Sequence, residues 1–538
     1  MSTTKQKRKF GYGGAAYLPN TVTEGQDLYA TDTLKHTFDT NNQRLDLTPT
    51  PNWNETNPDS PAFVRNKRSI DDILNEIETV RRIQNDTHIY GVKWDKTSSA
   101  MERIYDAAGI TTDTTNFVYS GSVNPNYNNP FDKLYPWSEC KQCNVDLTLY
   151  RALSAGDDIR DAVVAWYGDN DFATDGSNGF VGRYTPEFWY LGYERDNVKY
   201  IFIADKEVKG FLHHKPSIRS HGFGVDDGNN GVTSNDGQPM TNVAVSSIHS
   251  KATAGGFTLL DVYEYDANVA LFMVEFASTD SQAKLGSGCS EDYYSPNFTV
   301  IAAETGATAV LLPAAGKNYC IPGATLDFAT SKDGVDLSKR RTVVNSAVYN
   351  SDYCRVTFTP AIDLTTSLYP SIHGKNNADS IGNKSGYIGV NGKNNAWYRG
   401  AIMYANRWQY ILGAYRQTGT NHLWLSTIED CDNCDDLNTS DHFDTGVTQY
   451  TPSSESWQSV GDYGIVPGKL AAFGMITKAA SLTGDSQYCP LPSAGNTICL
   501  LGGRADGGSV CGVLCAHWYN AATASYWGYA AVPLLRSP

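Results

Sequence analysis

Short hydrophobic runs, broken at close intervals by Gly, Asn, Asp and Ser, fill this chain from about residue 88 onward. In "HIYGVKWD" and "VKYIFIADKEVKGFLHH", β-branched and aromatic residues alternate or cluster over a few positions and then meet a turn residue. Runs of this kind favour strands. We therefore predict an α+β fold that is mostly β. Later strands are expected at 298–303, 308–312, 354–358, 397–403, 408–416 and 422–427.

Two segments depart from this pattern and predict helices. Residues 69–84 begin at a plausible N-cap, Ser69, and place Ile or Val at positions 70, 73, 77 and 80. This is the spacing of a coiled-coil seam, and β-branched residues along such a seam favour trimers. A single amphipathic helix gives the same spacing, so both interpretations stay open. Residues 266–278, "DANVALFMVEFAS", are apolar almost all round, which predicts a helix buried under a sheet.

The chain of 538 residues is long enough for about three domains. Residues 1–68 are rich in Asn, Thr, Pro and Asp, which predicts an extended arm with little core of its own. We expect four parts in order: the arm at 1–68, a helical stem at 69–87, a small β-rich neck at 88–150 and a large head at 151–538.

The charge and the apolar content exclude several classes of protein. A net charge of −15 argues against a nucleic-acid partner, which needs a basic face. No run approaches the 18 apolar residues of a membrane span, so we expect no membrane insertion. The first residues lack the apolar stretch of a secretory signal, so synthesis in a cytoplasm is expected. The 11 cysteines then default to free, mostly buried thiols.

The last part of the chain has an unusual composition. From Gly507 to Leu535 there is no Lys, Arg, Asp or Glu, and aromatic residues lie among Gly, Ala, Ser and Cys. Missing charge is typical of a buried strand, whereas Tyr and Trp are also the residues that binding surfaces favour. Composition alone leaves this segment between core and surface.

Several stretches, taken in order, resemble one family of proteins. They are "IYGVKWD", "NPFDKLYPWSECKQCNV", "YGDNDFATDGSNGFVGRYTPEFWY", "LFMVEFASTDSQAKLGSGC", "WYRGAIMYANRWQYILGAY" and "GGRADGGSVCGV". Together they resemble tail-fibre or receptor-binding proteins of tailed bacteriophages from gut bacteria. More narrowly, they resemble the variable proteins of diversity-generating retroelements, which end in a C-type-lectin fold. The resemblance covers roughly residues 88–538, and the order of the stretches is more specific than any one of them.

This resemblance implies that the end of the gene is rewritten by a reverse transcriptase that mutates adenines. Asn codons of the AAY type would become codons that never encode Lys, Glu, Gln, Met or Trp. The variable region is expected at about 502–530. The residues implied to contact the ligand are Asp506, Val510, His517, Tyr519, Asn520 and Tyr526, with Ala524 and Tyr529 added. The residues implied to form the scaffold of the site are Gly502, Gly503, Gly508, Gly512, Trp518, Trp527, Arg399 and Trp408. Many relatives end in a Gly-Phe-Arg-like strand, whereas this chain ends "AAVPLLRSP", which leaves the register of the last strand open.

We find no sequence pattern for a metal site or a catalytic centre. The Glu-Pro-Asn, Gln-Pro-Asp and Trp-Asn-Asp motifs of calcium-dependent lectins do not occur. The acidic loop "IEDCDNCDDLN" lacks EF-hand spacing and is interpreted as a solvated loop. The pairs Cys140/Cys143 and Cys431/Cys434 would have to meet in space to bind zinc. Adjacent His213 and His214 would point to opposite faces of a strand. No cofactor and no metal are expected.

The fold family implied by the resemblance also includes formylglycine-generating enzymes, which use paired cysteines near the chain end. Cys511 and Cys515 lie in a comparable place, but their neighbours are Gly, Val, Leu and Ala, with no base to activate a thiol. We interpret them as small buried thiols. Arg399 is interpreted as a buried network residue, since a buried guanidinium needs partners.

These observations predict a non-enzymatic receptor-binding protein carried on a virion and made in the host cytoplasm. Its expected partners are a bacterial surface receptor, protein or glycan, and other virion proteins held through residues 1–68; a homotrimer is expected. One alternative is a capsid or tail decoration protein without a receptor role. A further alternative is a surface depolymerase or an enzyme of the formylglycine-generating type.

Overall fold

The computed structural model describes the chain in segments. They are residues 37–38, 44–45, 87–98, 100–112, 129–228, 231–235, 239–285, 298–318, 320, 322, 325–331, 337–371, 396–404, 407–417, 419–427, 441–475, 480, 482–491, 495–504, 507–526 and 528–538. The chain divides into two compact units, Met1–Ile73 and Leu74–Pro538. In the first unit, β1 (Thr37–Phe38) pairs with β2 (Arg44–Leu45) in antiparallel fashion. The helix expected at 69–84 lies outside the described residues, so the trimer seam remains a prediction.

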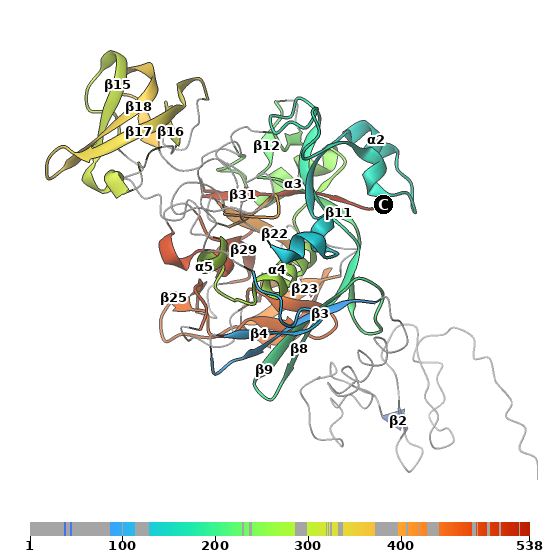
Figure 1. Ribbon diagram of the computed structural model, residues 1–538. Helices are drawn as coiled ribbons and strands as arrows, with labels where there is room; N and C mark the ends of the chain where they lie inside the picture. Colours follow the sequence, from blue (N-terminus) through green and yellow to red (C-terminus); the bar gives the residue numbers. More distant parts are fainter. Residues whose placement is uncertain are drawn as a thin grey trace, which may run out of the picture. The chain divides into compact units, whose positions relative to one another are not determined.

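The second unit is mostly β, as predicted, and three of its sheets are built around shared cores (Figure 1). The five-stranded sheet has the order β10 (Leu212–His214), β8 (Phe188–Arg195), β9 (Val198–Ala204), β3 (Ile89–Asp95) and β4 (Met101–Tyr105). The six-stranded sheet has the order β14 (Thr258–Leu259), β32 (Pro533–Arg536), β11 (Ser217–Ser220), β7 (Phe180–Thr185), β5 (Lys141–Val145) and β6 (Val163–Trp166). The eight-stranded sheet has the order β24 (His442–Thr448), β23 (His422–Ser426), β22 (Trp408–Arg416), β29 (Thr497–Gly502), β30 (Gly512–His517), β28 (Ser486–Cys489) and β25 (Ser456–Ser459), with β31 (Tyr529–Ala531) parallel to β22.

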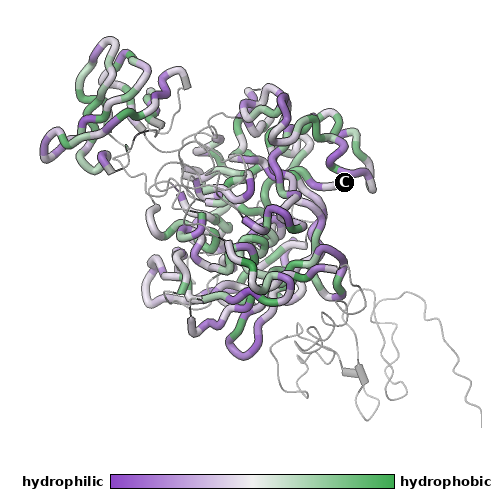
Figure 2. The backbone as a smooth tube through the Cα atoms, in the orientation of Figure 1, coloured by the Kyte–Doolittle hydropathy of each residue, from purple (hydrophilic) through white to green (hydrophobic). Residues whose placement is uncertain are grey.

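A further sheet has a core of its own. Its order is β15 (Glu304–Pro313), β18 (Tyr353–Leu364), β17 (Arg341–Val348), β16 (Thr325–Ala329) and β19 (Tyr369–Ser371). Three hairpins complete the strands: β12 (Val225–Asp226) with β13 (Val232–Thr233), β20 (Ala396–Tyr398) with β21 (Ala401–Tyr404), and β26 (Gly464–Val466) with β27 (Leu470–Phe473). In Figure 2, hydrophobic stretches alternate with hydrophilic turns along the strands.

Among the described residues of the second unit, the α-helices are α2 (Leu147–Ala152), α3 (Val245–Ala254), α4 (Val262–Phe276) and α5 (Ser281–Leu285). Short 3-10 helices are η2 (Pro130–Lys133), η3 (Trp137–Glu139), η4 (Ile159–Ala162), η6 (Ala314–Asn318), η7 (Leu337–Lys339) and η12 (Gly508–Val510). Among the described residues, no helix is both long enough and apolar enough to cross a bilayer.

Helix α4 is the centre of the second unit. Every one of its residues is buried, which confirms the helix predicted for 266–278, although it begins four residues earlier, after the N-cap Asp261. It packs against β3 and β9 of the five-stranded sheet and against β22 of the eight-stranded sheet, and Figure 1 shows it between them. A helix that is apolar all round can fold only where protein surrounds it, and this one is surrounded.

The few polar side chains of α4 each tie it to a different element. Asp266 accepts hydrogen bonds from the backbone nitrogens of Ala471 and Ala472 in β27, at 2.7 Å each. Glu264 accepts hydrogen bonds from Ser217 of β11, at 2.9 Å, and lies 2.9 Å from the ring of His214 in β10. Buried polar groups need such partners, and these fix the helix relative to three elements.

Strand β22 explains how the eight-stranded sheet is buried on both faces. All nine of its residues are buried. Tyr410 and Leu412 face one hydrophobic core, while Ile411 faces the other; the register then shifts between Ile411 and Tyr415, and Ala414 joins the core of Ile411. Alternate residues of a strand point to opposite faces, so a strand between two cores needs a nearly continuous hydrophobic run.

Three expectations about the organisation of the chain are corrected. The strand expected at 397–403 is a hairpin, because Arg399 and Gly400 both have positive φ (48° and 89°), which is the geometry of a tight turn. Residues 298–303 do not pair with a described strand; Val300 instead packs into the core of the β15–β18 sheet. The expected boundary between a neck at 88–150 and a head at 151–538 is also not followed, since β3 pairs with β9 and β5 pairs with β7.

Candidate functional site

The C-terminal segment divides into buried strands and an exposed connection. β29 and β30 are adjacent central strands of the eight-stranded sheet, and residues 518–528 connect β30 to β31. The residues implied to be scaffold are mostly buried here: Gly502, Gly503, Gly512, Trp518 and Trp408 are buried, and Gly508 is half-buried. Trp527 and Asp506 lie outside the described residues.

Gly512 shows why the scaffold is restricted in sequence. A Cβ at this position would clash with the carboxylate of Asp485. That carboxylate is buried and accepts a hydrogen bond of 2.7 Å from the backbone nitrogen of Leu514 in β30. Burial raises the pKa of Asp485 well above its usual range. The close approach leaves room only for glycine at 512.

The backbone of the 518–528 connection is held by residues that lie outside it. Four of its carbonyl oxygens accept hydrogen bonds from donors on other parts of the second unit. These are Asn520 O from Ile498 N (2.8 Å), Ala524 O from the Tyr410 hydroxyl (2.6 Å), Tyr526 O from Asn242 N (3.1 Å) and Gly528 O from Trp408 N (2.7 Å). The path of the connection is therefore fixed through its backbone, with the buried ring of Trp518 as a further anchor.

Several side chains of this segment, in contrast, are partly open to solvent. Tyr519 is 46% exposed and Tyr526 is 37% exposed. His517, Asn520, Ala524, Tyr529 and Val510 are half-buried. Val510 and Tyr529 also pack against the hydrophobic cores, so these two side chains contribute to the fold as well.

Five rings form a continuous aromatic face at this end of the sheet: Trp408, Trp457, Tyr488, His517 and Tyr519. The rings of His517 and Tyr488 stack with centroids 4.9 Å apart. Trp457 stacks on Trp408 at 6.0 Å and meets Tyr488 edge-on at 5.6 Å. Tyr519 meets Tyr488 edge-on at 5.8 Å. Trp457 is 40% exposed, which is unusual for a tryptophan and leaves its ring free to contact a ligand.

Sequence reasoning missed Trp457 and Tyr488, which come from β25 and β28 and not from the C-terminal segment. A signal was present for one of them. Trp457 lies between Ser456 and Gln458 in a polar strand without any other large apolar side chain, which points to an exposed ring and not to a core residue.

The aromatic face carries little charge. Burial, followed by the positive charge of Arg504, lowers the pKa of His517 to about 4, so the imidazole is neutral near pH 7. Its Nδ1 lies 2.9 Å from the side-chain amide of Asn520. The guanidinium of Arg504 lies 5.3 Å from the centre of the Tyr526 ring, a favourable cation–π distance.

Arg399 is a buried network residue, as predicted. Its guanidinium binds both oxygens of the buried Glu275, at 2.7 and 2.8 Å, and donates to the carbonyl oxygen of Trp137 at 2.9 Å. It also binds Asp132 at 3.0 Å. A paired and bidentate geometry of this kind is what a buried arginine requires.

The histidine pair behaves as the strand periodicity predicts. His213 is exposed and lies 2.7 Å from Glu187, whereas His214 is buried and contacts Glu264. The two rings therefore face opposite sides and do not share a ligand.

The cysteines that could carry chemistry are buried free thiols where the structure describes them. Cys511 and Cys515 are buried, and burial raises the pKa of Cys515 well above its ordinary value. Burial also raises the pKa of Cys143 to about 12. A raised pKa keeps the thiol protonated and unreactive.

Within the described ranges, no group of three His, Cys, Asp or Glu side chains is placed to hold a metal ion. Cys431, Cys434 and the acidic loop lie outside those ranges.

Comparison of the sequence with models of protein families, and with curated proteins, gave no match.

Proposed function

We propose that this chain is a virion-borne receptor-binding protein that attaches a tailed phage to a bacterial surface through its C-terminal face. The observation that supports this most strongly is the 518–528 connection. Its backbone is fixed by hydrogen bonds from Ile498, Tyr410, Asn242 and Trp408, while the side chains of Tyr519 and Tyr526 are exposed.

This arrangement suits a surface whose contacts change while its fold does not. Each of the four bonds uses a backbone carbonyl oxygen of the connection, and a carbonyl oxygen is present whatever side chain is attached. Net stabilisation of about 1 kcal/mol per bond is therefore kept when the side chains are replaced. Tyr and Trp on such a surface give contact area at low conformational cost.

The finer parts of the proposal rest on the sequence resemblance. The region after residue 88 is proposed to contain a C-type-lectin-like domain with a diversified segment near 502–530. Residues 1–68 are proposed to attach to the virion and residues 69–87 to form a trimer stem. Three copies would raise weak single-site binding by about 10²–10⁴ through avidity, which matters for a face that has not been selected against one receptor.

The test compares binding of labelled full-length protein to a panel of gut bacterial cells. The double variant Tyr519→Ser/Tyr526→Ser is expected to lose about tenfold or more in apparent affinity, because it removes both exposed rings of the segment. The matched control is Tyr349→Ser, which removes a ring that is 59% exposed in the turn between β17 and β18. Equal binding by the unchanged protein, the double variant and the Tyr349→Ser control would contradict the proposal. Unchanged attachment with less stable particles would favour the decoration protein instead.

Diversification is tested separately in the DNA beside the gene. We expect a nearly identical, Asn-rich template repeat next to a gene for a reverse transcriptase. A gene neighbourhood without either would remove the diversified segment from the proposal and leave the aromatic face as an invariant site.

A further inference from the structure

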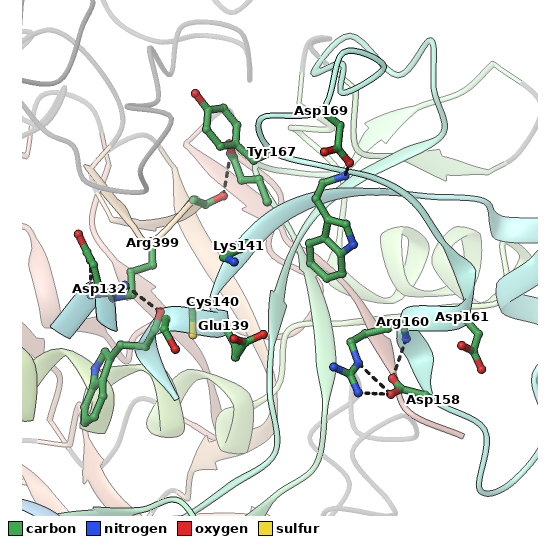
Figure 3. Close-up of a pocket in the computed structure, with 15 residues that line it drawn as sticks. Asp132, Glu139, Cys140, Lys141, Asp158, Arg160, Asp161, Tyr167, Asp169 and Arg399 are labelled. Carbon is green, nitrogen blue, oxygen red and sulfur yellow. Dashed lines mark hydrogen bonds and ion pairs between the residues drawn. The ribbon is translucent and has the colours of Figure 1, made fainter. Parts of the chain in front are cut away.

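A second site is suggested by a polar cavity of about 920 Å³ in the Leu74–Pro538 unit (Figure 3). Its walls come from η3, the start of β5, η4, residues 166–169 and the Arg399–Gly400 turn. The volume lies in the range typical of small-molecule sites, and the cavity is partly open to solvent. The aromatic face contributes none of its five residues to this lining.

Two ion pairs form opposite walls of the cavity. Arg399 binds Asp132 at 3.0 Å and is also held by Glu275, while Arg160 binds Asp158 through its Nε at 2.8 Å. Figure 3 shows these pairs on the two sides of the view, with Glu139 and Lys141 between them. Both guanidiniums are thus neutralised by carboxylates within the protein and leave little positive charge for a ligand.

The groups left without partners are mainly hydrogen-bond acceptors. The carboxylates of Glu139 and Asp161 line the cavity and accept no hydrogen bond from any residue that the structure describes. One oxygen of Asp169 accepts a hydrogen bond from the backbone nitrogen of Trp166 at 2.8 Å. Against these three carboxylates stands one lysine, Lys141, so the cavity favours positive charge.

Gln142 gives a second and independent sign of a missing ligand. It is only 6% exposed and lines the cavity from β5. Its amide nitrogen donates to the carbonyl oxygen of Gly400 at 3.0 Å, but its amide oxygen receives no donor from the described part of the chain. This oxygen lies on the lining of the cavity, where a donor group on a ligand can reach it.

Aromatic side chains complete the lining. Trp166 and Tyr167 are half-buried, and the Trp166 ring is positioned edge-on against Tyr184 at 5.7 Å. The backbone nitrogen of Tyr167 donates to the carbonyl oxygen of Gln142 at 2.9 Å, which anchors this segment to β5. Ring faces attract cations, and carboxylates beside them strengthen that preference.

The acceptors come from several elements around the cavity and do not converge on one point. In keeping with this, no described group of three His, Cys, Asp or Glu side chains is placed to hold a metal ion. We propose that the cavity binds an organic cation: a primary ammonium group carried on a body the size of a sugar ring or a lysine side chain. The ammonium group donates to one of the carboxylates, and its body lies against Trp166 or Tyr167.

The test titrates the full-length protein by calorimetry with matched probes. Glucosamine is compared with N-acetylglucosamine, and a trilysine peptide with its Nε-acetylated form. We expect at least one of the two cationic probes to bind about tenfold or more tightly than its acetylated partner. Glucosamine binding identifies an amino sugar as the source of the ammonium group, and binding of trilysine alone identifies a basic peptide. Equal binding of cationic and acetylated probes, or no binding of either cation, overturns the proposal.

Variants decide whether the cavity is the site. Glu139→Gln/Asp161→Asn is expected to weaken binding of the cationic probe about tenfold, with thermal unfolding nearly unchanged because neither carboxylate accepts a hydrogen bond from a described residue. The control Glu207→Gln/Glu304→Gln removes the same charge at exposed positions outside the lining and is expected to change binding less than twofold. An equal loss in the control would show attraction by net charge and would overturn the site. Tyr519→Ser/Tyr526→Ser should leave probe binding unchanged. The outcome at the cavity is therefore independent of whether the proposed receptor face binds bacteria.

Discussion

The aromatic face and the polar cavity use opposite ways of holding a binding surface. At the aromatic face, the backbone of the 518–528 connection is held by hydrogen bonds from residues outside it, while the partly exposed rings of Tyr519 and Tyr526 make edge-on contacts with Tyr488 and Tyr529. At the cavity, side chains hold one another: Arg399 is bound by Glu275 and Asp132. The 518–528 surface tolerates substitution, whereas the Arg399 wall of the cavity resists it, because removing Arg399 leaves the buried charge of Glu275 without its partner.

The largest effect is expected at the cavity wall. Arg399→Met leaves the carboxylate of Glu275, which is fully buried, without its bidentate partner. We expect a loss of about 3–5 kcal/mol in the free energy of unfolding. Denaturant unfolding measures it, and the double variant Arg399→Met/Glu275→Gln should recover part of the loss. A loss below about 1 kcal/mol would show that the wall is not held by this pair.

An intermediate effect on the free energy of unfolding is expected at His517 of the aromatic face, and it depends on pH. Burial, then the charge of Arg504, lowers its pKa in the folded protein to about 4, below the ordinary value of 6.5. Below pH 6.5 the unfolded chain takes up a proton that the folded protein does not, so stability falls as pH drops from 6.5 toward 4. Between pH 7 and pH 5 this amounts to about 2 kcal/mol.

His517→Phe should remove that part of the pH dependence while keeping an aromatic ring in the face. The control is Trp457→Phe, which changes another ring of the aromatic face and leaves the His517 imidazole in place. Thermal unfolding at pH 5 and pH 7 gives both values. A His517→Phe protein with the same slope as the unchanged protein would show that this imidazole is open to protonation in the fold.

The smallest effect on stability is expected at the exposed rings of the aromatic face. Tyr519→Ser and Tyr526→Ser should each change the free energy of unfolding by less than about 0.5 kcal/mol, because these side chains are largely exposed and the backbone bonds remain. Denaturant unfolding of each single variant measures this. A loss above about 2 kcal/mol at either position would contradict the contrast between a tolerant face and a resistant cavity.

Features that depend on near neighbours in the chain were predictable from the sequence. Helix α4 follows from an unbroken apolar run after an Asp, and β22 from nine residues with no turn former apart from one glycine. Opposite faces for His213 and His214 follow from strand geometry alone. The turn at Arg399–Gly400 was missed, because arginine rarely takes positive φ and does so here with its guanidinium held by Glu275, 124 residues earlier in the chain.

The sequence by itself determined that the chain is mostly β and that it carries a wholly buried helix. It also determined that the C-terminal segment combines glycines and aromatic residues and lacks charged residues from Gly507 to Leu535. Only the tertiary structure decided which residues meet. It placed Trp457 and Tyr488 beside His517 and Tyr519, and it closed a cavity from residues 132–169 and 399–400. The reason is physical: periodicity reports which face of an element is buried, but a site is formed by side chains whose separation in sequence carries no information about their distance in space.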